Sequence, residues 1–281
     1  MQRRLNIVKK SRLSNNKVKA NKYLLPLSKK IFVSYKELEG IAKKHNSKVF
    51  EIGNILRDEI LNSSFTEDIN KFNSMKILVL GGSQGAKVFS QQLPQIFKKL
   101  RNENNQIKVY HQCQSEQNDQ LSEFYNKAKI DYEIFNFTDK IIKYYSQANL
   151  VITRSGASVL GELLNCKIPF ISIPLPTSAD NHQLKNAEFY SKKGYGFFIE
   201  EKDIKNKLYD LIKLIFNDKS LINNIVLKQK GYSDKHIFLL SKRERKIHKL
   251  MEKYEKTLFQ KYYSSKKVKK TEELESVDLE M

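Results

Sequence analysis

The sequence predicts an α/β fold with a doubly wound, Rossmann-like parallel sheet. Three observations support this prediction. Short apolar runs alternate with segments of helical periodicity from Met75 onward. The first of these runs ends in a glycine-rich turn that leads directly into a helical pattern. Hydrophobic residues make up 40% of the 281 positions, which is enough for a large core or two modest ones. Regular alternation implies right-handed crossovers, with helices on both faces of the sheet.

The expected elements of this sheet follow one another between Met75 and Ile199. Strands are expected at 76–80, 107–113, 132–137, 150–153, 170–174 and 195–199. Helices are expected at 86–100, 115–129, 139–148, 158–166 and 181–193, the last closed by Gly194, with one more at 204–218. In open parallel sheets, ligands bind beyond the carboxyl ends of the strands, so that edge is the place to look for a site.

The segments before this sheet are short and partly basic. We expect a basic segment at 1–22 that is mobile or forms one loose helix. Within 23–61 we expect strands at 30–35 and 48–54, joined by a short helical stretch at 36–45. The polar residues 62–74 are the best candidate for a linker to the domain at 75–218.

The C-terminal part, 219–281, is predicted to be a basic helical tail. Apolar residues fall close to one face of its helical pattern amid many lysines: Ile247, Leu250, Tyr254, Leu258 and Tyr262. Such a helix can dock on the protein with a solvated basic face, or lie on an anionic membrane surface. The sequence alone leaves both readings open.

Charge and composition limit the classes of function. The formal net charge is +20, which attracts nucleic acid, anionic lipid or phosphorylated ligands. Only eight of the 51 basic residues are arginine, whereas nucleic-acid readers depend on arginine, and no nucleic-acid partner is expected. No apolar run has the length of a membrane span, and the start lacks a secretory signal, so we expect a cytoplasmic location. Cys113 and Cys166 lack metal-ligand spacing and are expected to be buried thiols.

The turn after the first strand has the features of an anion site. Gly81, Gly82 and Gly85 let the backbone turn sharply, and Ser83 adds a hydroxyl donor. The helix that follows points free N–H groups and its positive dipole end at the same spot, which suits a diphosphate. The pattern is neither the dinucleotide fingerprint nor a P-loop. A tight strand-helix turn without a ligand is the alternative for this stretch alone.

Two further turns point at the same edge. After strand 150–153, the small residues Ser155, Gly156 and Ala157 leave backbone amides reachable, and Glu162 can accept hydrogen bonds from two neighbouring hydroxyls. After strand 170–174, "PTSADNHQLKNA" offers Asp180 or Asn181 as an N-cap and gathers amide side chains at a helix start. Such amides suit sugar hydroxyls. Three such loops at one edge make chance a poor explanation.

The motifs together resemble a known family. "EIGNILRDEI", "GGSQGA", "RSGASVLGEL" and "IPFISIPLPTSADNHQLKNA" are similar, in this order, to the MurG family of bacterial peptidoglycan glycosyltransferases. The similarity covers about residues 20–204 and is strongest over 75–200. The resemblance implies the C-terminal, donor half of a two-domain GT-B fold, with a remnant of the N-terminal domain. It also implies transfer of GlcNAc from UDP-GlcNAc to lipid-linked N-acetylmuramyl-pentapeptide, with peripheral contact with the inner membrane.

The resemblance assigns the phosphate end of the donor to one group of residues. Ser83 and the amides around Gly82 and Gln84 would hold the diphosphate. Arg57, in the "GNILR" turn, would add positive charge near it, and the backbone at Thr138 would read the uracil edge. No metal and no cofactor are implied, because the helix dipole and arginine can stabilise the leaving diphosphate.

The sugar end falls to a second group under the same resemblance. Ala157 and Ser158 would line the nucleotide pocket, and Glu162 would take the ribose hydroxyls. His182 and Gln183 would hold the GlcNAc hydroxyls.

The sequence also departs from the family pattern. Family members begin with an acceptor domain that carries a GGTGGH loop with a histidine close to the chemistry, and neither is found here. The catalytic residue therefore stays unassigned. Three hypotheses remain: a transferase working as a partial chain, a UDP-GlcNAc-binding fragment that needs a partner chain, and a basic nucleic-acid or membrane-surface binder.

Overall fold

The computed structural model describes residues 7–10, 30–33, 43–51, 56, 58–61, 63, 74–82, 87–178 and 181–236. The chain divides into two compact units, Met1–Lys235 and His236–Met281. All elements described here lie in the first unit, apart from the final residue of the last helix. The expected linker at 62–74 and the helical pattern between Ser241 and Lys270 fall largely or wholly outside the described residues.

A six-stranded sheet forms the centre of the first unit, and all its neighbouring strands are parallel. Its strands are β4 (Met75–Leu80), β5 (Ile107–Gln112), β6 (Asp131–Phe135), β7 (Leu150–Thr153), β8 (Phe170–Ser172) and β9 (Phe197–Phe198). Their order is β6-β5-β4-β7-β8-β9, in which the first strand and the fourth lie side by side at the centre. This is the doubly wound Rossmann order, so the predicted fold class is confirmed.

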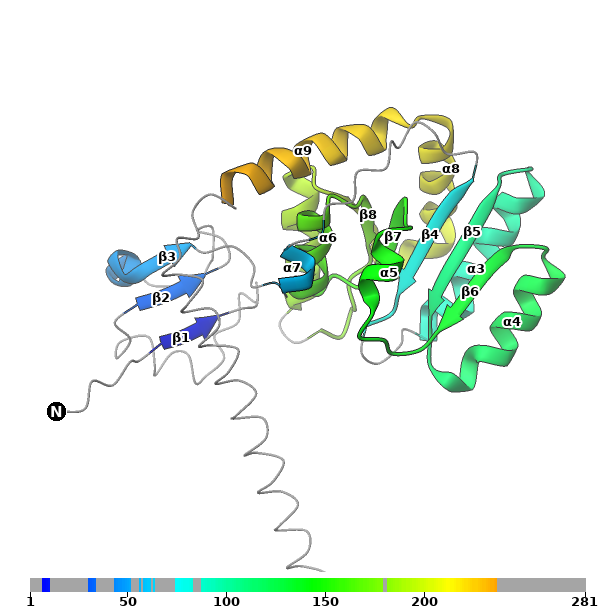
Figure 1. Ribbon diagram of the computed structural model, residues 1–281, viewed down its shortest axis with the longest axis horizontal. Coiled ribbons are helices and arrows are strands. Elements are labelled where there is room, and N and C mark those ends of the chain that lie inside the picture. The colour runs from blue at the N-terminus through cyan, green and yellow to red at the C-terminus, as the bar shows by residue number, and fades with distance from the viewer. Residues whose placement is uncertain are drawn as a thin grey trace, which may run out of the picture. The chain divides into compact units, whose positions relative to one another are not determined.

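The helices follow the predicted alternation with the strands (Figure 1). They are α3 (Lys87–Asn102), α4 (Asn118–Lys127), α5 (Ile141–Tyr145), α6 (Ala157–Cys166), α7 (His182–Lys192), α8 (Tyr209–Asn217) and α9 (Ser220–His236). A 3₁₀ turn at Ser115–Gln117 precedes α4, and a π turn at Ile204–Leu208 precedes α8. Gly194 closes α7 in the left-handed region with φ of 72°, as expected.

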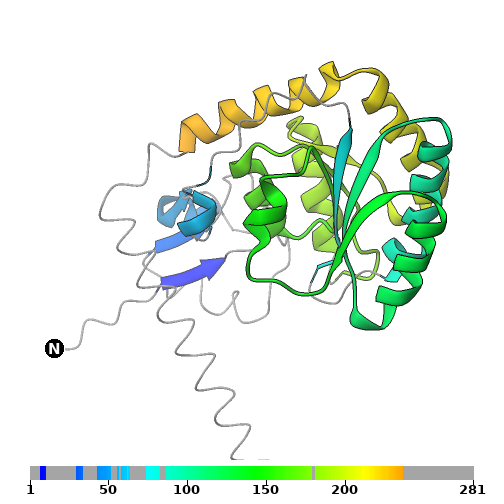
Figure 2. The same ribbon diagram turned by 45° about the vertical axis from the view of Figure 1, so that its right-hand side comes forward.

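The sheet is covered on both faces because successive side chains of a buried strand point to opposite sides. Ile77 and Val79 of β4 belong to the core on the α3, α4 and α8 side. Leu78 and Leu80 belong to the core on the α5, α6 and α7 side. The connecting helices α3 and α4 therefore lie on one face, and the connections from α5 onward to α7 lie on the other. Figures 1 and 2 show helices on each side of the sheet. This change of face opens the edge between β4 and β7 to a ligand.

A smaller sheet forms near the N-terminus. Its parallel strands β1 (Ile7–Lys10), β2 (Lys30–Val33) and β3 (Val49–Glu51) pair in that order, and a 3₁₀ helix at Lys43–Lys48 precedes β3. The strands expected around 30–35 and 48–54 are therefore present in shorter form. Residues 7–10 correct the expectation of a mobile segment or loose helix at 1–22, because pairing with β2 gives this stretch a strand conformation.

The last described helix, α9, packs on the large domain. Ile222 and Ile225 are buried, and Gln229 Nε2 donates to the carbonyl oxygens of Ile168 and Tyr195 at 3.2 and 2.7 Å. Those carbonyls lie just before β8 and β9, so α9 lies along the amino edge of the sheet (Figure 1). Among the described residues, no helix is both long and apolar enough to cross a membrane.

Candidate functional site

The centre of the carboxyl edge lies between β4 and β7. Gly81 and Gly82 directly follow β4, and Gly82 has a φ of 79°, a conformation that residues other than glycine rarely adopt. A Cβ at Gly82 would meet nothing within 4 Å, so backbone conformation rather than space requires glycine here. Helix α3 begins at Lys87, and its free N–H groups supply donors near this turn. Ser83 and Gln84, the predicted phosphate contacts, lie outside the described residues, as does Arg57.

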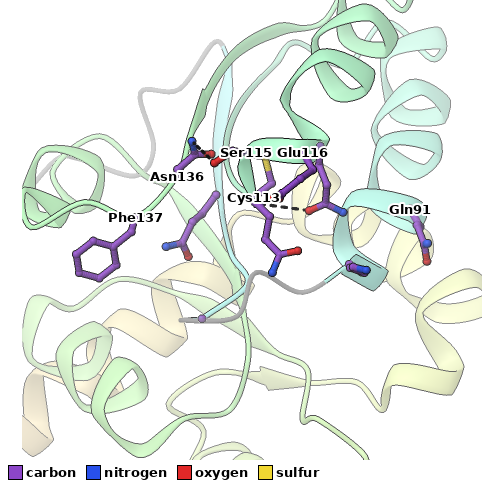
Figure 3. A pocket seen from close by; sticks show the side chains of 11 residues that line it. Gln91, Cys113, Ser115, Glu116, Asn136 and Phe137 are labelled. Carbon is purple, nitrogen blue, oxygen red and sulfur yellow. Dashed lines mark hydrogen bonds between the residues drawn. The ribbon is translucent and has the colours of Figure 1, made fainter. Parts of the chain in front are cut away.

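An open pocket of about 730 Å³ lies at this edge, over the half of the sheet formed by β4, β5 and β6 (Figure 3). Three loops and the start of α3 contribute its lining: Gly82, Lys87, Gln91, Gln112, Cys113, Gln114, Ser115, Glu116, Gln117, Asn136 and Phe137. Side-chain amides are prominent in this lining. Each can both donate and accept, which suits a heterocycle or a sugar better than an apolar group.

Hydrogen bonds tie the loops of the pocket together. Asn136 Nδ2 donates to Ser115 Oγ at 3.3 Å, which links the loops after β6 and β5 (Figure 3). Ser90 Oγ donates to Gln117 Oε1 at 3.2 Å, which links α3 to the loop after β5. Phe137 is 86% exposed, and its ring projects away from the other labelled side chains. Protein–protein hydrogen bonds thus hold the lining together, and an exposed aromatic ring forms part of it.

The two cysteines are buried thiols, as the sequence predicts. Cys113 lines the pocket and donates through Sγ to Asn118 Oδ1 at 3.2 Å. Burial raises the pKa of its thiol, which keeps the group protonated at neutral pH and unsuited to nucleophilic attack.

The loop after β7 is held by an arginine. Arg154 Nη2 lies 2.5 Å from Glu201 Oε2, and Nη1 donates to the carbonyl oxygens of Ile173 and Pro174 at 3.4 and 3.3 Å. Its guanidinium also lies 4.7 Å from the centre of the Phe89 ring on α3. Arg154 therefore connects elements on both sides of the β4–β7 junction, and its charge is balanced within the protein.

Helix α6 carries three of the predicted nucleotide contacts. Ala157, the first residue of the helix, is buried, and Ser158 is exposed. Glu162 is half-buried, and its Oε2 accepts a hydrogen bond of 2.9 Å from Tyr145 Oη on α5. The carboxylate is therefore anchored to a neighbouring helix.

The start of α7 carries the predicted sugar contacts. His182 and Gln183 are its first two residues and are half-buried. Gln183 Oε1 accepts from Leu175 N at 3.0 Å, so the side chain is held through its oxygen. Asn181 lies at the expected N-cap position with φ of 55°, but its side chain makes no capping hydrogen bond; Ser178 Oγ instead accepts from Gln183 N at 3.4 Å. The Ser178 hydroxyl, rather than the Asn181 side chain, therefore caps the start of the helix.

Thr138 follows Phe137 and precedes α5. Its Oγ1 accepts from Lys140 N at 3.1 Å, which stabilises the turn that leads into the helix. Gly82 and the Phe137 next to Thr138 come together in the pocket. Residues of α6 and α7 lie after the other strands of the same edge and are not part of its lining: Ala157, Ser158, Glu162, His182 and Gln183.

Sequence reasoning missed the part of the pocket supplied by β5. Gln112, Gln114 and Gln117 belong to a run of polar residues, "HQCQSEQN", without a glycine turn or a known spacing. The available signal was a polar cluster placed directly after a buried strand, at the same edge as Gly82.

A comparison with family models matches residues 76–237 to the glycosyltransferase family 28 C-terminal domain. The chain belongs to glycosyltransferase family 28. The matched range takes in the six-stranded sheet apart from Met75, and all of α9.

Two bacterial relatives of this family 28 chain carry the same name, UDP-N-acetylglucosamine–N-acetylmuramyl-(pentapeptide) pyrophosphoryl-undecaprenol N-acetylglucosamine transferase. The one from Pelagibacter ubique is 34% identical over 219 residues, which is 77% of this chain and 59% of the relative. The one from Rickettsia felis is 33% identical over 239 residues, 82% of this chain and 66% of the relative. The match thus spans about six-tenths to two-thirds of the length of these relatives.

Solved structures of glycosyltransferases have the same fold. The crystal structure of Acinetobacter baumannii MurG has a TM-score of 0.62 at 21% identity, covering 76% of this chain and 58% of that one. The glycosyltransferase of kitacinnamycin has a TM-score of 0.52 at 14% identity, covering 81% of this chain and 55% of that one. These similarities confirm the predicted C-terminal half of a GT-B fold.

Proposed function

We propose that this chain binds UDP-GlcNAc at the carboxyl edge of its large sheet. It would serve as the donor-binding part of a hexosyltransferase that moves GlcNAc to lipid-linked N-acetylmuramyl-pentapeptide in peptidoglycan synthesis. The observation that carries the proposal is the junction of β4 and β7 within a family 28 domain. The three loops proposed to bind phosphate and hydroxyl groups follow the neighbouring strands β4, β7 and β8 there. The names of the relatives support the choice of sugar and acceptor.

The diphosphate belongs beside Gly82 and the start of α3. A positive-φ glycine allows close approach of the backbone, and the helix N-terminus favours negative charge. Lys87 lines the adjoining pocket and adds a cation that sequence reasoning did not assign. In this proposal Ser83, Gln84 and Arg57 complete the phosphate contacts.

The nucleoside belongs between the loop after β6 and the start of α6. The backbone at Thr138 would read the uracil edge, with Ala157 and Ser158 beside the nucleotide. Glu162 would accept the two ribose hydroxyls, a role that suits a carboxylate whose side chain is already anchored.

The sugar belongs at the start of α7. Because Gln183 is held through Oε1, its amide nitrogen is the group that can donate to a sugar hydroxyl. His182, the residue before it, is the second proposed contact with the GlcNAc hydroxyls.

The reaction would be a single displacement with inversion. An acceptor hydroxyl oxygen forms a bond to the anomeric carbon while the bond from that carbon to the UDP oxygen breaks, and the hydroxyl proton passes to a general base. The helix dipole and the basic residues at the phosphate end stabilise the charge on the leaving UDP. No residue of this chain is assigned as the base. The acceptor groove and the base would come from an acceptor domain, in the same protein or in a partner chain.

The same reasoning proposes where the protein works. Nucleotide sugars are cytoplasmic and the acceptor is held in a membrane, so we propose a cytoplasmic protein with peripheral contact with the inner membrane. The basic residues offer attraction for anionic lipid.

The proposal is tested by titrating the full chain with UDP-GlcNAc in a calorimeter. We expect saturable binding that Glu162→Ala weakens at least tenfold, because the ribose hydroxyls lose a charged acceptor. Glu123→Ala is the matched control, since Glu123 is an exposed carboxylate on α4 that pairs with Lys127 of the same helix at 2.6 Å; this variant should bind as the wild type does.

A parallel titration with single-stranded RNA at two salt concentrations tests the alternative that the chain is a nucleic-acid-binding protein. Absence of UDP-GlcNAc binding, together with RNA affinity that falls steeply with salt, would overturn the proposal in favour of a nucleic-acid binder.

A further inference from the structure

Glu162 has a neighbour that no sequence motif indicates. Tyr145 Oη, on α5, donates to Glu162 Oε2, on α6, at 2.9 Å. The two residues are 17 positions apart in the chain, on the helices that precede and follow β7 in the sequence. This contact therefore exists only because the fold packs α5 against the same face as α6.

The tyrosine is held firmly. Tyr145 is 1% exposed and belongs to the same apolar core as Leu160, Leu163 and Leu164 of α6. A buried ring packed against the helix that bears its partner leaves the hydroxyl few alternative positions. The hydroxyl thus fixes the place of one carboxylate oxygen of Glu162.

A single phenol hydroxyl occupies only part of the capacity of a carboxylate. The two oxygens of a carboxylate offer about four acceptor positions, so a carboxylate that accepts from Tyr145 can accept from other donors as well. The two oxygens on one carbon also have the spacing needed to accept from two neighbouring hydroxyls. A glutamate that is already ordered loses less side-chain freedom when a ligand binds.

Helix α5 also connects the contact between Tyr145 and Glu162 with the backbone at Thr138, which is proposed to read uracil. Thr138, whose Oγ1 accepts from Lys140 N, lies just before the helix, and Tyr145 is its last residue. One short helix therefore connects the stretch proposed to read uracil with the tyrosine that holds the carboxylate proposed to bind the ribose.

We infer that Tyr145 is a positioning residue that aims Glu162 at the ribose hydroxyls of the bound nucleotide. The inference rests on the proposed function. It deepens that proposal by assigning recognition of the ribose hydroxyls to a pair of residues instead of to Glu162 alone. Tyr145 acts through Glu162 and does not itself touch the ligand.

The test uses Tyr145→Phe in the full chain, which removes the hydroxyl and keeps the ring. Its matched control is Tyr144→Phe, the preceding residue of the same helix, whose hydroxyl donates to Glu133 Oε1 at 2.9 Å and not to Glu162. The probes are UDP and 2′,3′-dideoxy-UDP, which differ only in the ribose hydroxyls. Thermal unfolding of each variant reports separately on stability.

We expect Tyr145→Phe to weaken UDP binding about tenfold and to leave the affinity for 2′,3′-dideoxy-UDP unchanged. The preference for UDP over the dideoxy nucleotide then shrinks by the same factor, whereas Tyr144→Phe keeps the wild-type preference. A purely structural role for Tyr145 would instead lower the affinity for both nucleotides together, and that result would overturn the inference.

Two failures can be told apart. If the wild type binds neither nucleotide, the proposed function is wrong and the inference is lost with it. If the wild type prefers UDP and Tyr145→Phe keeps that preference, the nucleotide site stands and only the role of Tyr145 is refuted.

Discussion

Polar side chains near the sheet edge are anchored to the protein by specific atoms. Glu162 is held by Tyr145, Gln183 by the backbone of Leu175, and Arg154 by Glu201. Each anchor lies outside the helix or loop that carries the anchored side chain. Side chains that are already ordered by folding lose less freedom when a ligand binds, so these contacts would favour the proposed binding of a polar ligand.

His111 shows a different use of a buried polar group. It is fully buried on β5, and its Nδ1 lies 2.7 Å from Tyr125 Oη. Burial lowers the pKa of the imidazole to about 3, so the ring is neutral in the folded protein at neutral and mildly acidic pH. This side chain therefore contributes to packing rather than to acid-base chemistry at the nearby edge.

The lowered pKa of His111 predicts a pH-dependent stability. Below its ordinary value of 6.5 the unfolded chain takes up a proton that the folded protein does not. The free energy of unfolding should therefore fall as pH drops from 6.5 toward 3, by up to about 1.4 kcal/mol for each pH unit. Urea denaturation of the wild type and of His111→Gln, measured at several pH values between 7.5 and 5, isolates this contribution. Equal pH slopes for the two proteins would contradict the prediction.

At the scale of elements, the strands and helices of the large sheet follow from hydrophobic periodicity. The strand at 150–153 has the predicted bounds, α6 begins one residue earlier than predicted, and α7 is one residue shorter at each end, because their apolar patterns end at clear breaks. Pattern alone did not indicate β1, whose residues lie in a strongly basic stretch. Nor could it find the contact of Tyr145 with Glu162, which arises from tertiary packing.

Helix α9 shows where such reasoning is weakest. Its sequence, "SLINNIVLKQKGYSDKH", mixes buried apolar residues with many polar ones, and we assigned it to the tail. The structure instead buries Gln229 completely, where its amide satisfies two backbone carbonyls. Hydrophobic periodicity counts only apolar residues, so it does not predict the burial of a glutamine. The packing of α9 on the sheet therefore could not be predicted from the pattern.

This role of α9 predicts a large effect at Gln229. Gln229→Ala removes the donor for the carbonyls of Ile168 and Tyr195 and leaves two buried acceptors to be satisfied, which costs about 2–4 kcal/mol of stability. Lys230→Ala, at the next and exposed position, should change stability by less than about 0.5 kcal/mol. Urea denaturation of both variants checks the prediction, which would be wrong if they proved equally stable.

At the scale of the whole molecule, residues of this chain are proposed to bind the sugar donor, and none is proposed to bind the lipid-linked acceptor. The proposed contacts that the structure describes lie beyond the carboxyl ends of the strands of one sheet, and α9 packs beside β8 and β9 at the amino edge. Because transfer between two bound substrates depends on holding them against each other, a donor site by itself contributes affinity but little acceleration. The net charge of +20 can gather anionic lipid or nucleic acid but does not supply that geometry.

This division predicts that binding and transfer can be separated. The purified chain, given UDP-GlcNAc and the lipid-linked acceptor, should bind the donor yet transfer little GlcNAc, as measured by the label recovered in the lipid product. Adding the acceptor domain of a relative as a separate chain should raise transfer. Glu162→Ala in the same mixture should remove the gain, since the donor is then no longer held. Rapid transfer by the chain alone would show instead that residues before Met75 form an acceptor surface of their own, and the division argued here would be wrong.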